Sequence, residues 1–245
     1  MGIILLLAAS ACSAFAVGMV TAGGSALILI PIVHWTLGAH AIAPVITVGT
    51  MSSGLSRIIM FRQHIRWDIT RWYLPGALLG AFIGARWFSL LVAEEEYLQL
   101  LRWIVGGFLI STLLQYRLGA KRVAFAMPTA AMLPVGIVVA TASGLVGGLG
   151  PVLNPFYFNL DCQRQEIVAT KAFNAFFMHL TKIATYVTFG ALNQELFLYG
   201  IVVGVGAVVG NLIGRRWLER IGEKRFRSAV VWMMAFSGVL ILWQG

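Results

Sequence analysis

Charged residues are scarce in this chain of 245 residues. Lys and Arg number 18 and Asp and Glu nine, so charged residues make up 11% of the sequence, against about a quarter in ordinary soluble domains. Apolar residues reach 59%, and mean hydropathy is +0.86. A soluble core cannot bury so much apolar surface, whereas helices and closed barrels can place it in lipid. The apolar runs are close in length to the about 20 residues of a helix that crosses a bilayer, and they are too long for barrel strands. The composition therefore predicts an all-α integral membrane protein, a polytopic helical bundle.

Cysteine is nearly absent, with only Cys12 and Cys162 in the chain. Two cysteines are too few for a disulfide scaffold, and the sequence has no CxxC, HExxH or Cys/His cluster that would hold a metal. We therefore expect that the protein binds no metal and no cofactor and that it is not an enzyme. A membrane thiol–disulfide electron carrier with one cysteine in each half is an alternative. However, Cys12 precedes the glycine cluster that begins at Gly18, and Cys162 follows the one that begins at Gly144, so the two cysteines are not equivalent.

The apolar runs form two sets of five. They fall near residues 3–20, 24–37, 41–61, 69–91 and 98–116, and near 126–143, 149–160, 165–189, 195–214 and 226–244. The second run of each set is the shortest. As a helix it would be only about 20 Å long, which is less than the thickness of the hydrocarbon core, about 30 Å. We predict that these two runs form partial or broken helices.

The two sets share sequence. GALLGAFIGARW, which begins at Gly76, recurs as GAVVGNLIGRRW 130 residues later, with three glycines, an arginine and a tryptophan in register. The glycine clusters at Gly18–Gly24 and Gly144–Gly150 also correspond, and a proline closes each short run that follows. The sequence therefore predicts an internal duplication within one transmembrane domain, with repeats at residues 1–118 and 119–245.

The net charge of +9 comes mainly from three short stretches between apolar runs. These stretches hold Arg57, Arg62, Arg66 and Arg71; Arg117, Lys121 and Arg122; and Arg215, Arg216, Arg220, Lys224, Arg225 and Arg227. Basic residues at the ends of apolar runs mark the cytoplasmic side, so the charge indicates topology and not a nucleic-acid partner. Stretches around Glu95 and Glu195 then lie outside, as do both termini. The fourth runs of the two sets then cross the membrane in opposite directions. This predicts inverted repeats with a substrate site between them.

Each glycine cluster joins a long run to a short one. Glycines there free backbone N–H groups, and a helix that begins near Ser25 or Pro151 would direct its positive end at the middle of the membrane. An anion is the natural ligand of such ends, although small residues also permit close helix packing. For the repeated glycines Gly76, Gly80 and Gly84 and their copies, close packing is the interpretation that we favour. The candidate site residues here are Gly23, Gly24, Ser25, Gly148, Gly150 and Asn154.

Two longer runs add polar candidates. In residues 165–189, helical spacing places Lys171, Asn174 and Lys182 on one inward face, with His179 nearby. Lys171 is near the start of this run, so snorkelling to the cytoplasmic surface is an alternative. In residues 41–61, Thr50 and Ser53 share a face with Thr47 and Arg57, but such hydroxyls also bond their own backbone. We count Lys171, Asn174, Thr50 and Ser53 as candidate substrate-binding residues.

The glycine breaks, the stretch RQEIVATKAFN and the repeated GxxxGxxxGxRW resemble those of the TauE/SafE family, also called the toluene sulfonate uptake permease family. The resemblance covers nearly the whole chain. It implies a multi-pass permease or exporter of the bacterial inner membrane that moves sulfite, organosulfonates or related small organic anions through the lipid bilayer. The resemblance leaves open the exact substrate, the coupling ion, the direction of transport and whether the chain forms a homo-oligomer. A membrane scaffold without transport activity is a further alternative.

Overall fold

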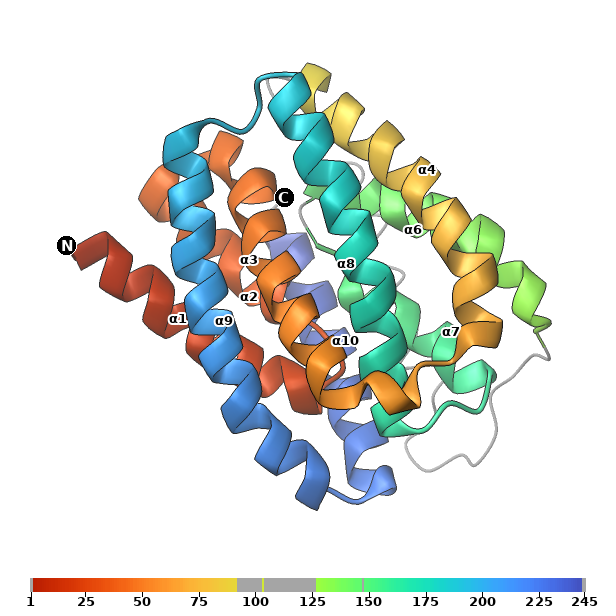
Figure 1. The fold of residues 1–245 in the computed structure, drawn as a ribbon. Helices are drawn as coiled ribbons and strands as arrows, with labels where there is room; N and C mark the ends of the chain where they lie inside the picture. Colours follow the sequence, from red (N-terminus) through yellow and green to blue (C-terminus); the bar gives the residue numbers. More distant parts are fainter. Residues whose placement is uncertain (1, 92–102, 104–126, 147, 244–245) are drawn as a thin grey trace.

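The computed structural model describes residues 2–91, 103, 127–146 and 148–243, and every regular element in these ranges is a helix (Figure 1). The N-terminal half contains α1 (Gly2–Val20), α2 (Ser25–Leu37), α3 (Ala39–Phe61), the 3₁₀ turn η1 (Arg62–His64) and α4 (Trp67–Leu91). The C-terminal half contains η2 (Thr129–Ala131), α6 (Met132–Val146), η3 (Gly150–Leu153), α7 (Asn154–Asn159), α8 (Arg164–Thr188), α9 (Gln194–Arg220) and α10 (Glu223–Trp243). The prediction of an all-α fold is confirmed.

The helix bounds follow the predicted runs closely, with two differences. α9 continues to Arg220, six residues beyond the predicted end near 214, because Arg and Glu are good helix formers and Arg215 pairs with Glu219 one turn on. The first helix of the second half begins at Met132, since Pro128 is extended and a 3₁₀ turn follows it. The repeat boundary at 118/119, Glu95 and Lys121 lie outside the described residues, as does the predicted run at 98–116 except for residue 103.

Six long helices pack side by side in the order α1, α9, α3, α8, α4, α6 (Figure 1). α3 and α8 pack against each other at the centre, and each is flanked by a helix from the other half of the chain. α2 packs on α1 and α3, and the 3₁₀ turn η3 packs against α7 and α10. The starts of both short elements lie near α8, because Lys171 of α8 donates to the carbonyls of Ala22, just before α2, and of Gly150, the first residue of η3.

The glycine stripes of α4 and α9 form two matching interfaces. A Cβ atom on the stripe would collide with carbonyl oxygens of the neighbouring helix: Gly76, Gly80 and Gly84 meet Leu133, Ile137 and Thr141 of α6, and Gly206, Gly210 and Gly214 meet Ala8, Cys12 and Ala16 of α1. Backbones approach this closely only where side chains are absent. The packing alternative noted for glycine thus describes these two stripes well.

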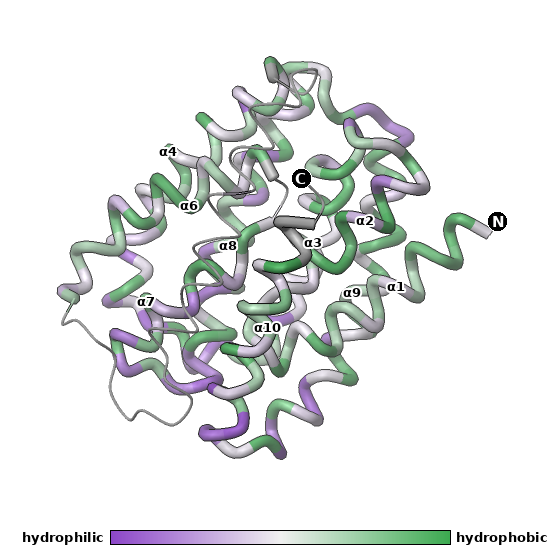
Figure 2. The backbone as a smooth tube through the Cα atoms, turned by 180° about the vertical axis from the view of Figure 1, so that it is seen from behind, coloured by the Kyte–Doolittle hydropathy of each residue, from purple (hydrophilic) through white to green (hydrophobic). Residues whose placement is uncertain are grey.

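The opposite faces of the same helices are apolar and exposed. Leu79 and Phe82 on α4 are 60% and 50% exposed, and Val205 and Leu212 on α9 are 61% and 53% exposed. Figure 2 shows α1 and much of α9 as mainly hydrophobic tubes. Three helical stretches, Gly2–Val20, Ala39–His64 and Gln194–Arg220, are long and apolar enough to cross a membrane. Such broad exposed apolar faces are stable only in lipid, so this is a helical membrane protein.

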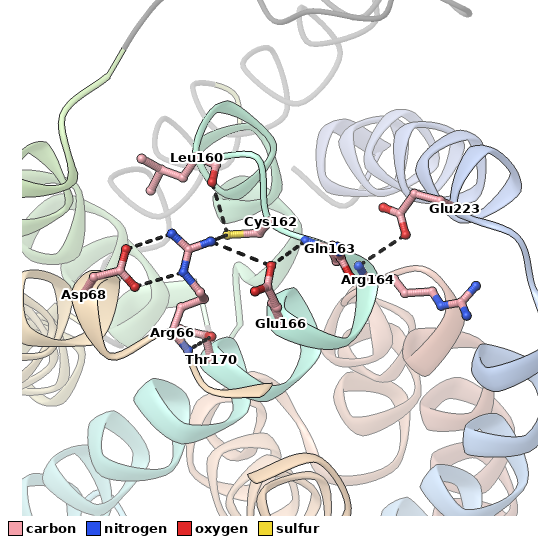
Figure 3. A network of polar contacts seen from close by, with 9 residues as sticks. All are labelled: Arg66, Asp68, Leu160, Cys162, Gln163, Arg164, Glu166, Thr170 and Glu223. Carbon is pink, nitrogen blue, oxygen red and sulfur yellow. Dashed lines mark hydrogen bonds and ion pairs between the residues drawn. The ribbon is translucent and has the colours of Figure 1, made fainter. Parts of the chain in front are cut away.

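A polar network fixes the start of α8 (Figure 3). Arg66, just before α4, bonds Asp68 through two N–H groups at 2.9 and 2.8 Å, and its Nη1 lies 3.7 Å from Glu166. Glu166 also caps α8 by accepting from the backbone N–H of Gln163 at 2.8 Å. Nearby, burial raises the pKa of the Cys162 thiol to about 12. The network sets where α8 begins, and Lys171 follows two turns later.

Two of the basic stretches gather at this end of the bundle. Arg62 and Arg215 line the same surface cavity, and the backbone N–H of Arg164 lies 3.4 Å from Glu223 of α10. Since α4 begins where α9 ends, these two helices run in opposite directions. The third basic stretch lies outside the described residues.

Candidate functional site

The first helix break spans the four residues between α1 and α2. Gly23 and Gly24 have φ values of 134° and 90°, a region that side chains rarely adopt, and Ala22 has φ 51°. Thr21 stabilises the turn by donating its hydroxyl to the Gly23 carbonyl at 2.8 Å. α2 then begins at Ser25 without a side-chain cap, and the N–H groups of its first turn, which include those of Ser25 and Ala26, have no acceptor within the helix. These groups give the break the positive end that the sequence predicts.

The second break is built differently. Gly150 begins a 3₁₀ turn of four residues, α7 adds only six more, and Pro151 has no N–H group. Elements this short carry little of the dipole of a full helix. The expected second positive helix end near Pro151 is therefore weak, and Gly150 presents its carbonyl oxygen to the neighbouring α8 instead.

The two breaks meet. A Cβ atom on Gly23 would lie 3.3 Å from the carbonyl carbon of Gly150 and 3.5 Å from the Nζ of Lys171. Lys171 bridges both breaks: its ammonium donates to the Ala22 carbonyl, to the Gly150 carbonyl at 2.8 Å and to Asn154 Oδ1 at 2.5 Å. Lys171 does not snorkel to the cytoplasmic surface, because its ammonium group bonds the two helix breaks inside the protein. All three of its donors are also occupied.

A cavity of about 120 Å³ lies beside this bridge. Nine of the ten candidate residues line it: Gly23, Gly24, Ser25, Thr50, Ser53, Gly148, Gly150, Lys171 and Asn174. Asn154 lies behind Lys171 as its partner. Three titratable nitrogen groups face the cavity, those of Arg57, Lys171 and His179, and none of the described carboxylates does. The wall of this cavity therefore carries basic side chains and, among the described residues, no carboxylate to pair with them.

The other polar candidates differ in what they can offer a ligand. Asn174 is 1% exposed, its Nδ2 lies 3.5 Å from the Tyr157 hydroxyl, and its Oδ1 has no partner among the described residues. Thr50 donates to the carbonyls of Ile46 and Thr47 at 2.6 and 3.1 Å, so the backbone-bonding alternative holds for its proton. Asn174 keeps free hydrogen-bonding capacity, and Thr50 keeps only its acceptor side.

Lys182 is a structural residue. It is fully buried, and its ammonium donates to the carbonyl and hydroxyl oxygens of Ser143 at 2.8 and 2.9 Å. Tyr186, one turn on, donates to the Gly144 carbonyl at 2.8 Å. Both side chains donate to carbonyls in the last turn of α6. A positive charge there also interacts favourably with the negative end of the helix dipole. The predicted inward face of α8 is confirmed, but Lys182 holds the end of α6.

Arg57 shares a predicted helical face with Thr50 and Ser53, but we did not count it as a candidate site residue from the sequence. Its position near the end of α3 marked it as a cytoplasmic flanking arginine, whereas the structure places it on the cavity wall. Its Nε donates to Oδ1 of Asn211, 154 residues away, at 3.0 Å. Its one-turn spacing from Ser53 was the only available signal. Tyr73 of α4 and Ser143 of α6 also line the cavity without any sequence indication.

A comparison with protein families finds one described as "Sulfite exporter TauE/SafE", whose model matches residues 6–241. The match covers nearly the whole chain, including both helix breaks and every residue named on the cavity wall. No curated protein and no solved structure matches the chain.

Proposed function

The chain belongs to the sulfite exporter TauE/SafE family, a transporter family and not an enzyme family, and on that premise we propose that it moves small oxyanions such as sulfite or organosulfonates by alternating access around the central cavity. The observation that carries the proposal is the cavity wall, where Arg57, Lys171 and His179 face a common space without a carboxylate among the described residues. A buried positive site without a counter-ion favours an anion as its ligand. The thiol–disulfide carrier has no comparable support.

An anion that enters this cavity loses its hydration, and the wall offers several replacements. The first-turn N–H groups of α2 at Ser25 and Ala26 are donors, and the Asn174 amide supplies the two N–H donors of its NH₂ group when it turns toward the ligand. Lys171 adds its charge at short range while its protons remain on the breaks. The candidate residues then act together as one site between the two breaks.

Inverted repeats, at residues 1–118 and 119–245, are part of the proposal. The repeated glycine interfaces support them, because α4 packs on α6 as α9 packs on α1. The opposite directions of α4 and α9 support the inversion. In such an arrangement, one repeat rocks against the other and exposes the central site to each side in turn.

The driving force needs no second ion for export. An inside-negative membrane potential drives an anion outward at about 2.3 kcal/mol per charge per 100 mV. The described part of the chain places no carboxylate on the cavity wall, so a carboxylate proton relay is not part of the proposed mechanism. His179, 5% exposed on that wall, is the residue available for proton coupling.

Transport by the purified protein in liposomes tests the proposed function. We expect the anions sulfite, sulfoacetate or thiosulfate to cross when a potassium–valinomycin potential is imposed. Taurine, a zwitterion without net charge, is the fourth compound and is not driven by the potential, and empty liposomes serve as the control. Imposed proton and sodium gradients then identify any coupling ion. Absence of flux for all four compounds under every gradient contradicts the proposal and favours a scaffold.

The multi-pass topology in a bacterial inner membrane makes a separate prediction. Glu195 lies in the first turn of α9, a helix of 27 residues that is about 40 Å long, and Arg225 lies just beyond the other end of α9, in the first turn of α10. In a variant without Cys12 and Cys162, we expect Glu195→Cys to react with an impermeant maleimide only from outside. Arg225→Cys should react only from the cytoplasm. Labelling of both positions from the same side contradicts this topology.

A further inference from the structure

Arg57 is a cation whose hydrogen-bonding capacity is only partly used. Its Nε donates to Asn211, and its guanidinium carbon lies 5.8 Å from the centre of the Phe15 ring. Its Nη2 is buried and finds no acceptor among the described residues. A buried N–H donor without an acceptor is unfavourable, most of all on a charged group, unless a ligand supplies the acceptor.

Asn211 fixes the orientation of Arg57. Asn211 is fully buried in α9, and its Nδ2 donates to the Ser53 carbonyl at 3.1 Å, the Ser53 hydroxyl at 2.9 Å and the Ser56 hydroxyl at 2.8 Å. With three acceptors around Nδ2, the amide oxygen can face only Arg57. The Asn211 amide therefore holds the guanidinium beside the cavity by its Nε and leaves the Nη groups for another partner.

Lys171, the other strong cation of the cavity, is in the opposite state. Its three N–H groups are all taken by the two helix breaks and Asn154. A ligand that bonded Lys171 directly would first have to displace one of these acceptors. Of the two strong cations on the wall, Arg57 is the one with a free donor.

Arg57 also lies toward the cytoplasmic end of the cavity. A second, wider cavity of about 700 Å³ opens at that end, and Arg62, His64 and Arg215 line it together with one carboxylate, Glu219, which pairs with Arg215. Ser56 belongs to the wall of this vestibule and accepts from Asn211, which in turn holds Arg57. The Arg57–Asn211 pair thus connects the basic vestibule with the central cavity.

We infer that Arg57 binds the transported anion directly, at the cytoplasmic side of the central cavity, and that Asn211 is the positioning residue that aims it. This inference rests on the proposed transport of anions. A guanidinium held by its Nε presents its remaining N–H groups to one ligand, and such forks match the paired oxygens of sulfite and sulfonate groups. The sulfur oxyanion is therefore bound through two of its oxygens.

Three variants test the inference: Arg57→Gln, Arg57→Lys and Asn211→Asp. Each is assayed for sulfite flux in liposomes and for the rise in melting temperature that sulfite or sulfate causes in detergent. We expect Arg57→Gln to lose at least tenfold in flux and to lose the anion-dependent rise. Its melting temperature without anion should equal or exceed that of the parent, because an unpaired buried donor has been removed. Arg57→Lys should keep a fraction of the flux, since charge remains without the fork.

Asn211→Asp tests the positioning role. Its carboxylate still bonds Arg57 but neutralises it, so flux and the anion-dependent rise should fall as in Arg57→Gln. Its second oxygen cannot donate to the Ser53 carbonyl as Nδ2 does, so we also expect a lower melting temperature without anion. Arg216→Gln is the matched control, because Arg216 is exposed on α9, and we expect parental flux.

The outcomes distinguish the two proposals. Parental flux and a parental anion-dependent rise in Arg57→Gln overturn the role of Arg57 and leave the proposed function standing. A fall in its melting temperature without anion, with the rise intact, shows a structural role and also overturns the inference. If the parent transports none of the anions, the proposed function fails, and the anion-dependent rise alone decides the role of Arg57. A parent that shows no such rise overturns the inference as well.

Discussion

Replacing Lys171 with Met should lower sulfite flux about 100-fold, which corresponds to about 3 kcal/mol of lost interaction. The side chain remains long and unbranched, but the charge beside the cavity disappears. The Ala22 and Gly150 carbonyls and Asn154 Oδ1 also lose their donor. Buried acceptors left without a donor cost about 1–3 kcal/mol each, partly offset here by the removal of a buried charge. We therefore expect the melting temperature to fall together with the flux.

The combined loss distinguishes Lys171 from Arg57, whose replacement by Gln should leave stability intact. Flux in liposomes and thermal unfolding in detergent measure the two effects separately. Lys224→Met is the matched control, because Lys224 is exposed at the start of α10, and neither property should change. Lys171→Arg should keep part of the flux, since the charge is retained. If Lys171→Met transports sulfite as well as the parent, the site must be assigned without Lys171.

Substituting one glycine of either stripe should destabilise the bundle strongly. A Cβ atom on Gly80 or Gly210 would overlap the carbonyl oxygen of Ile137 or Cys12, and a backbone oxygen cannot move aside as a flexible side chain can. The helices must separate, which forfeits packing along the whole interface. We expect Gly80→Ala and Gly210→Ala each to cost about 2–3 kcal/mol, and the corresponding leucine variants to accumulate poorly in the membrane.

Gly222 offers the matched control for these substitutions. A Cβ atom at Gly222 meets nothing within 4 Å, so Gly222→Ala should unfold at the parental temperature. The amount of monodisperse protein in detergent and its melting temperature are the measurements. Parental melting temperatures for both Gly80→Ala and Gly210→Ala would show that the close backbone approach is not required for stability.

Local pattern was enough to predict most of the helices. Apolar runs gave the extents of α2, α3 and α8 to within about two residues, because the length and period of a run determine what it can bury. Helical spacing likewise placed Lys171 and Asn174 on one inward face of α8. The glycine repeat indicated two close helix contacts, although it could not name the partner helices α6 and α1. These features depend on residues within a few turns of one another.

The chemistry of the cavity was decided by contacts between distant parts of the chain. Arg57 had the sequence context of a flanking arginine, and only the packing of α9 against α3 gives it Asn211 as a partner, 154 residues away. Similarly, the sequence indicated that Lys171 faces inward but not which groups it bonds. In the structure, the two breaks and Asn154 accept all three of its protons, and one of these acceptors, Ala22, is 149 residues away. Spacing along a helix fixes which face a side chain occupies. Which donors remain free on that face depends on the atoms that other helices bring to it, and only the tertiary structure determines those.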